Sequence, residues 1–222
     1  ERAVGTLLKR SESNFLYLNF VRQALEKKLE QGNQTFDPDD YADGLAGWYK
    51  DQMTRSFATV PSGVISNQVL LRNVIGTILA AREPLHIHDD LPQLSGVPLD
   101  VVETVLRETE LSNFFTKRGD NRLYIFHKSI TDWLTLAPPY GDSKHDFVIK
   151  APEKDLMQRH GLLMDEPGWR TSRAIMAKIT DEPYWARNIQ RHLEHLNAWN
   201  DGWKRLLNSN NAWVMTAVKQ DG

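Results

Sequence analysis

The 222-residue chain contains no cysteine, and this absence excludes several kinds of chemistry at once. Disulfide bonds, a catalytic thiolate and cysteine-ligated zinc are all ruled out. No stretch approaches the roughly 18 consecutive apolar residues of a membrane-spanning helix, so we expect no membrane span. The net charge is −2, whereas a general nucleic-acid surface needs a basic excess. We therefore expect a cytoplasmic chain without a DNA partner.

Motifs for phosphate, magnesium and acyl chemistry are missing as well. The sequence holds no G-x-x-x-x-G-K-[ST] loop and no acidic strand end of the kind that binds magnesium. It also holds no G-x-S-x-G nucleophile motif. We thus expect a chain that is no enzyme by itself, with no catalytic residue, no metal site and no cofactor of its own. Residues 1–4 lack both a methionine and a signal-peptide pattern, so we expect a longer protein upstream.

Helical periodicity dominates what is present, and it predicts a mainly α fold. Apolar residues recur at helical spacing after a group of capping residues, Ser11 to Asn14, and this helix ends near Gly32. A second helix is predicted to open at Asp37-Pro38 and to run to about Phe57. The apolar positions of the first helix are Phe15, Leu18, Val21, Leu25 and Leu29. We assign residues 1–60 to a first helical domain.

Residues 65–138 combine helices with short β-prone runs. The pattern predicts a helix over 68–82, a strand over 85–87, helices over 89–94 and 98–110, and a final helix over 129–136. Two β-prone runs, 113–116 and 122–126, flank a glycine-containing turn, which predicts a β-hairpin. This order of helices, strand and hairpin is that of a winged-helix domain.

Residues 141–222 are predicted to be helical, with short breaks at prolines and glycines. The breaks lie at Pro152, Pro167-Gly168, Pro183 and Asp201-Gly202. The chain has seven tryptophans, and we expect Trp185, Trp199, Trp203 and Trp213 to pack between helices. We assign this segment to a second helical domain that leads to C-terminal repeats.

Several motifs, in this order, resemble one family. The first is Ser13-Asn14-Phe15-Leu16-Tyr17-Leu18, and the second combines Gly44-Leu45, Trp48-Tyr49 and Arg55-Ser56-Phe57. The strongest is Ala80-Ala81-Arg82-Glu83-Pro84-Leu85, followed by Phe126-His127-Lys128-Ser129-Ile130-Thr131-Asp132-Trp133-Leu134. Together they resemble the region after the nucleotide-binding domain of STAND NTPases, the NACHT/NB-ARC-like and NLR-related switch proteins.

The resemblance implies a regulatory role in signal transduction, including that of innate immunity. It implies that ADP in the parent protein holds the helical parts inactive, and that ATP releases them for homo-oligomerisation. ADP or ATP with magnesium would be bound by an upstream nucleotide-binding domain. The partners would be that domain and the downstream repeats of the same protein.

His127 is the first site residue that the resemblance implies, because the matching histidine of the family reaches the β-phosphate of ADP. The alternative is a histidine bonded to local backbone at the start of a helix. Asn14, Phe15 and Tyr17 would line the adenine side of the site. The alternative for Phe15 and Tyr17 is a place in the helical core.

Other patterns bear on metal binding, on DNA binding and on an alternative function. His86 and His88, and likewise His192 and His195, have ligand-like spacing, but the second pair is not H-E-x-x-H, and we expect surface histidines and no metal. The helix over 98–110 carries four acidic residues against Arg107, which disfavours DNA. The alternative function is a free-standing protein-interaction module with no link to a nucleotide. A phosphate-binding loop upstream of Glu1 would discriminate the two.

We predict that the isolated chain neither hydrolyses ATP nor binds ADP at micromolar concentration, because it lacks the phosphate loop and the magnesium carboxylate. Isothermal titration with ADP and magnesium checks this. Micromolar binding by the chain alone would show that the missing loop is not needed.

Overall fold

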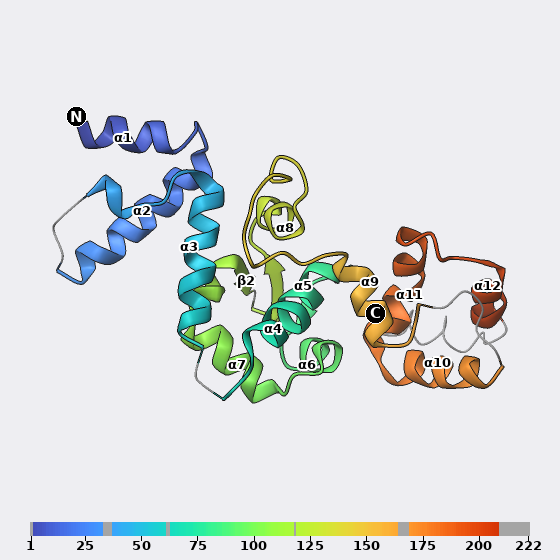
Figure 1. Cartoon of the computed structure of the whole chain (residues 1–222). Helices are drawn as coiled ribbons and strands as arrows, with labels where there is room; N and C mark the ends of the chain where they lie inside the picture. Colours follow the sequence, from blue (N-terminus) through green and yellow to red (C-terminus); the bar gives the residue numbers. More distant parts are fainter. Residues whose placement is uncertain (1, 33–36, 61–62, 118, 164–168, 209–222) are drawn as a thin grey trace. The chain divides into compact units, whose positions relative to one another are not determined.

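The computed structural model describes residues 2–32, 37–60, 63–117, 119–163 and 169–208 of the chain. The described chain is mainly helical and carries a small three-stranded antiparallel sheet, so the predicted α-rich class is confirmed (Figure 1). None of the helices in this part is long and apolar enough to cross a membrane.

The chain divides into two compact units. Unit 1 consists of Glu1–Val64, Val105–Phe114 and Phe126–Val148. Unit 2 consists of Ile65–Thr104, Phe115–Ile125 and Ile149–Gly222. Because the division falls inside the segment 65–138, the three predicted domains remain a prediction.

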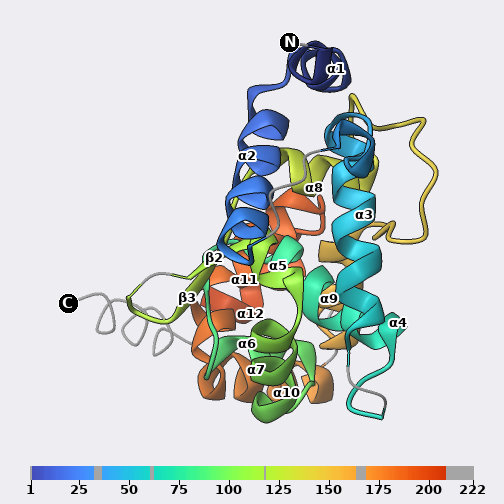
Figure 2. The ribbon, with the colours of Figure 1, turned by 90° about the vertical axis from the view of Figure 1, so that its left-hand side faces the viewer.

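Unit 1 is built around two helices that pack side by side, α2 (Phe15–Glu30) and α3 (Gly44–Ala58) (Figure 2). Phe20 of α2 stacks on Trp48 of α3, with ring centroids 3.9 Å apart and planes 5° from parallel. The unit also holds α1 (Arg2–Arg10), 3-10 turns at Pro38–Asp40 and Glu110–Phe114, and α8 (Lys128–Thr135). Its buried side chains include Tyr17, Phe20, Val21, Leu45, Trp48, Tyr49, Met53, Phe114, Ile130 and Trp133.

The predicted start of the second helix was wrong. Asp43 is extended, with φ −78° and ψ 122°, and Gly44 follows with a positive φ of 65°. Since that conformation favours glycine, the chain cannot continue as a helix from Pro38, and α3 begins only at Gly44. Arg10 of α1 holds the intervening turn by donating to the carbonyl oxygens of Pro38 (2.7 Å) and Tyr41 (2.6 Å).

The buried face of α2 also differs from the predicted one. Phe15 is 83% exposed and Leu29 is 58% exposed, whereas Tyr17 and Phe20 are buried. Val21 is buried as predicted, and the stacking of Phe20 on Trp48 places the aromatic side of α2 against α3.

Unit 2 contains the sheet, with strand order β1–β3–β2. The strands are β1 (Leu85–His86), β2 (Phe115–Lys117) and β3 (Arg122–Ile125), and the pairs Leu85↔Leu123 and Phe115↔Ile125 fix the register. The predicted hairpin is therefore confirmed. The unit begins with α4 (Asn67–Val69), a π-helical stretch at Leu70–Ile75 and α5 (Gly76–Ala80), and continues with α6 (Asp90–Ser95) and the start of α7 (Leu99–Glu108).

The rest of unit 2 consists of α9 (Pro152–Arg159), α10 (Trp169–Asp181), α11 (Pro183–His195) and α12 (Asp201–Asn208). Three of the predicted breaks coincide with helix starts, and Trp185 and Trp203 are buried as expected. The predicted break at 167–168 and Trp213 lie outside the described residues. Helix was wrongly predicted for 141–151, which has none. The positive φ of 45° at Ala151 separates this segment from α9, which begins at Pro152.

A buried polar network joins α9, α11 and the bend that follows α5 in unit 2. Glu153 of α9 accepts hydrogen bonds from Arg82 Nε (2.8 Å) and from His192 Nδ1 (2.6 Å), and it also pairs with His195. The Tyr184 hydroxyl accepts from the Arg82 backbone N–H (3.1 Å) and lies 2.8 Å from His192 Nε2. In the Nδ1–H tautomer of His192, Tyr184 donates to Nε2 and His192 donates its Nδ1 proton to Glu153. Glu153, His192 and the Tyr184 hydroxyl are thus each hydrogen-bonded within this network, as burial requires.

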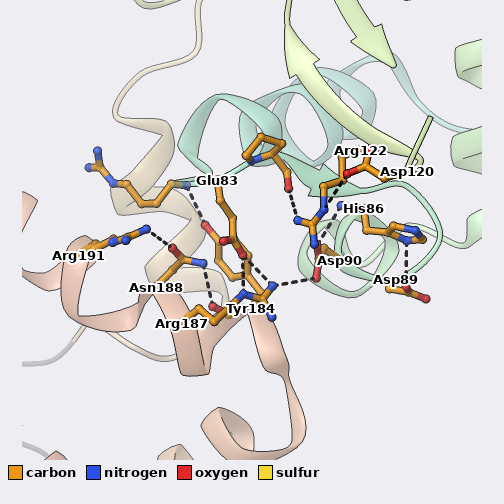
Figure 3. Close-up of polar contacts among 12 residues, drawn as sticks. Glu83, His86, Asp89, Asp90, Asp120, Arg122, Tyr184, Arg187, Asn188 and Arg191 are labelled. Carbon is orange, nitrogen blue, oxygen red and sulfur yellow. Dashed lines mark hydrogen bonds and ion pairs between the residues drawn. The ribbon is translucent and has the colours of Figure 1, made fainter. Parts of the chain in front are cut away.

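A second set of ion pairs links α11 to the segment around β1, as Figure 3 shows. Arg187 donates through Nε (2.9 Å) and Nη2 (2.7 Å) to Glu83 and lies 4.0 Å from Asp90. Asp90 in turn accepts from the backbone N–H of His86 (2.9 Å). Glu83 therefore has a structural partner within unit 2, as does its motif neighbour Arg82.

We predict that Glu153→Gln lowers the free energy of unfolding by about 2–4 kcal/mol, since it leaves Arg82 without its buried counter-ion. Burial alone would raise the pKa of Glu153, but hydrogen bonds from His192 and Arg82 hold it below its usual 4.5. A carboxyl whose pKa is lower in the folded state than in the unfolded state stabilises the fold. This stabilisation is complete at a pH above the unfolded-state pKa and is lost as the pH falls through the folded-state pKa. The stability of the wild type should therefore fall more steeply on acidification than that of Glu153→Gln.

Urea unfolding at neutral and acidic pH measures both effects. Glu194→Gln on the exposed side of α11 is the matched control, with an expected change of at most about 0.5 kcal/mol. Equal losses in the two variants would contradict a structural role of the network.

Candidate functional site

The start of α8 places His127 on the surface of unit 1. His127 is exposed and extended, with φ −150° and ψ 141°, and it caps the helix. Its Nδ1 accepts a hydrogen bond from the backbone N–H of Ser129 (3.2 Å) and lies 2.7 Å from the Ser129 hydroxyl. Nδ1 of His127 is therefore bonded to local backbone at the start of a helix, as the alternative interpretation expected, but this accounts for only one of the two ring nitrogens.

The other ring nitrogen has no hydrogen-bond partner among the described residues. An Nδ1 that accepts from a backbone N–H carries no proton, so a neutral ring has its proton on Nε2. His127 thus presents an Nε2–H donor. It does so at a helix N-terminus, where free backbone N–H groups favour negative charge.

Neighbouring side chains complete the surroundings of His127. The Phe126 ring is 43% exposed, and its centroid lies 5.9 Å from that of Phe20 on α2. Lys128 donates to both carboxylate oxygens of Asp132 at 2.8 Å. Asp132 is therefore paired within its own helix.

The Ser129 hydroxyl connects His127 to α3. Its oxygen lies 2.6 Å from the hydroxyl of Tyr49, whose side chain is fully buried. Burial raises the pKa of Tyr49 and keeps the phenol protonated. Burial, followed by the negative charge of Asp132, also raises the pKa of the nearby Tyr140. Sequence reasoning did not find this connection, because Tyr49 and Ser129 are 80 positions apart.

The three other predicted site residues lie in the same unit with different surroundings. Asn14 caps α2, since its Oδ1 accepts from the backbone N–H of Tyr17 (3.2 Å). Tyr17 is fully buried and donates to the carbonyl oxygen of Ala42 (2.6 Å). Phe15 is 83% exposed and so lies outside the core. None of these three bonds directly to His127 among the described residues, and their role toward adenine stays a prediction.

Trp133 fixes the opposite end of α8. It is buried, and the His145 ring stacks on it with centroids 3.9 Å apart and planes 14° from parallel. His145 Nε2 lies 3.3 Å from the carbonyl oxygen of Trp133, and its Nδ1 accepts from the backbone N–H of Phe147 (3.2 Å). Nε2 is therefore the donor. Burial lowers the pKa of His145.

The remaining histidine pairs have carboxylate partners. His86 Nδ1 lies 2.9 Å from Asp89, and His88 Nε2 lies 3.1 Å from Glu103. His192 and His195 both contact Glu153. Within the part of the chain that the structure describes, no group of three or more potential ligands could hold a metal ion.

Comparison of the chain with protein-family models, with curated proteins and with solved structures found no match. The family resemblance thus depends on the motifs quoted above. The geometry at His127 is independent of that resemblance.

We predict that His145 titrates below its usual pKa of 6.5 in the folded protein, because burial disfavours its charged form. For a histidine whose pKa is lower in the folded state, the folded protein is most stable at a pH above the unfolded-state pKa. That stability is lost as the pH falls through the folded-state pKa, because protonation favours the unfolded state. Proton NMR of the imidazole over a pH series gives the midpoint, and the same measurement in denaturant supplies the reference. A folded midpoint at or above the reference would contradict the stacked, buried ring.

Proposed function

We propose that this chain is the regulatory switch part of a STAND-type signalling NTPase, and that His127 contacts a phosphate of the bound nucleotide in the inactive state. The observation that carries the proposal is the exposed Nε2–H donor of His127, inside the Phe126-His127-Lys128-Ser129 motif. A phosphate oxygen is a strong acceptor, and its negative charge suits the start of α8.

The nucleotide would bind to an upstream domain, since the sequence of this chain has no phosphate loop. This chain would contribute the contact from His127, and its helices would cover the nucleotide-binding site of that domain. Loss of that contact on exchange of ADP for ATP would release the helices for homo-oligomerisation, a rearrangement biased by phosphate contacts. A ligand shifts such an equilibrium only by its differential affinity for the two states, so His127 must leave the phosphate in the active state.

The order of elements supports a winged helix within the proposed switch. Helix, strand, two helices and a β-hairpin follow one another from α4 to β3, and α8 comes next. We propose that this segment presents His127 as a winged-helix domain, with residues 1–60 and 141–222 as the helical domains on either side.

A free-standing interaction module is the second candidate. Two exposed aromatic rings favour it, since Phe15 is 83% exposed and Phe126 is 43% exposed. Asn14 and Tyr17 fit it as well, because both make bonds that belong to the fold of unit 1. A phosphate-binding loop in the sequence preceding Glu1 would favour the switch, and its absence there would favour the module.

We predict that His127→Ala in the full-length protein weakens ADP binding about ten- to a hundredfold, the range for a hydrogen bond to a charged group. The oligomeric fraction in ADP should rise accordingly. Isothermal titration and light scattering measure the two quantities.

His127→Asn is the matched variant. Asparagine is a good N-cap residue but lacks the imidazole donor, so it should keep the stability of α8 and still bind ADP as weakly as the alanine variant. If His127→Asn bound ADP like the wild type, His127 would be a helix cap alone and the proposal would fail.

A further inference from the structure

The hydrogen bonds that connect Tyr49, Ser129 and His127 run in one direction. The Ser129 backbone N–H can only donate, so His127 Nδ1 must be an acceptor. The 2.7 Å contact between Nδ1 and the Ser129 oxygen also needs one proton, and the unprotonated nitrogen cannot supply it. The Ser129 hydroxyl therefore donates to His127.

Tyr49 is the donor in its hydrogen bond with Ser129. A serine hydroxyl has a single proton, and Ser129 uses it toward His127. The 2.6 Å contact between Tyr49 and Ser129 must then be donated by the tyrosine. The protons are thus ordered from Tyr49 to Ser129 to His127, and the ring is left with its own proton on Nε2.

Tyr49 itself has little freedom to move. Its side chain is fully buried, and rings from three segments of unit 1 surround it. The ring centroids of Trp48, Phe114 and Trp133 lie 5.7, 6.0 and 5.6 Å from that of Tyr49. A hydroxyl on such a ring is a fixed reference point on α3, to which the start of α8 is bonded.

We propose that Tyr49 and Ser129 are positioning residues, which orient His127 as an Nε2–H donor and make that orientation depend on the packing of α3 against α8. If α3 moves away from α8, Ser129 loses the bond that directs its proton, and the His127 ring is no longer held. The geometry of the donor would then report the packing of helices within unit 1. We call the ordered hydrogen bonds from Tyr49 through Ser129 to His127 the relay. A role of the relay in nucleotide binding rests on the proposed function, whereas the relay itself does not.

Nitrogen-15 NMR of the imidazole in the chain as it stands tests the relay without a nucleotide. At about pH 8.5, where histidine is neutral, the wild type should show Nε2 protonated, Nδ1 as an acceptor and an ordered ring. Ser129→Ala should leave the ring mobile, and Ser129→Thr should restore its order. A protonated Nδ1 in the wild type, or an unchanged ring in Ser129→Ala, would overturn the relay.

A double-mutant cycle tests the part played by Tyr49. The effects of Tyr49→Phe and Ser129→Ala on the unfolding equilibrium constant should deviate from additivity by more than about twofold, as expected for bonded partners. Tyr17→Phe is the matched control, because it removes another buried hydroxyl of unit 1 that bonds to Ala42. It should be additive with Ser129→Ala. Additivity of the Tyr49 and Ser129 variants would remove Tyr49 from the relay.

The link to the nucleotide has a separate readout. In the full-length protein, Ser129→Ala should weaken ADP binding about two- to tenfold, the range of one neutral hydrogen bond, and Ser129→Thr should restore it. Unchanged ADP affinity with a mobile ring would overturn the link between Ser129 and the nucleotide, whereas the proposed function is tested separately by the His127 variants and the hydrogen-bond order by the NMR result.

Discussion

The hydrogen bond between Tyr49 and Ser129 is the contact that links the exposed histidine of unit 1 to its aromatic core. It joins α3 to the start of α8, and it is possible only because packed rings hold Tyr49 in place. A bond to a buried hydroxyl is costly to break, since the orphaned group cannot turn to water. The packing of aromatic rings around Tyr49 in the core of unit 1 therefore determines how His127 presents its Nε2–H donor at the surface.

Unit 2 follows the same physical rule with charged groups. Glu153 is buried, and it is tolerated because Arg82 and His192 satisfy it and Tyr184 completes the chain of bonds. The Ala80–Leu85 motif acquires a structural meaning there, since Arg82 reaches Glu153 and Glu83 reaches Arg187. A motif quoted for its family resemblance is thus also a set of contacts that hold the helices of unit 2 together.

Local chemistry explains which features could be predicted from the sequence. The hairpin and the starts of α9, α11 and α12 followed from turn residues, prolines and an Asp-Gly pair, whose effects act within a few positions. The buried face of α2 and the start of α3 did not, because they depend on a ring of another helix and on the positive φ of Gly44. His127 was identified by its motif. Its partners Ser129 and Tyr49 were not, since no local pattern shows which distant hydroxyl reaches a helix cap.

His127 has a defined donor atom, Nε2, and a partner on Nδ1 that fixes its direction, so its contact with a nucleotide can be measured directly. The decisive measurement is a structure of the full-length protein with ADP bound. We expect the His127 Nε2 atom to lie within about 3 Å of a phosphate oxygen, with Nδ1 still bonded to Ser129. An ADP-bound structure in which His127 keeps its bond to Ser129 but faces solvent, away from the nucleotide, would contradict it.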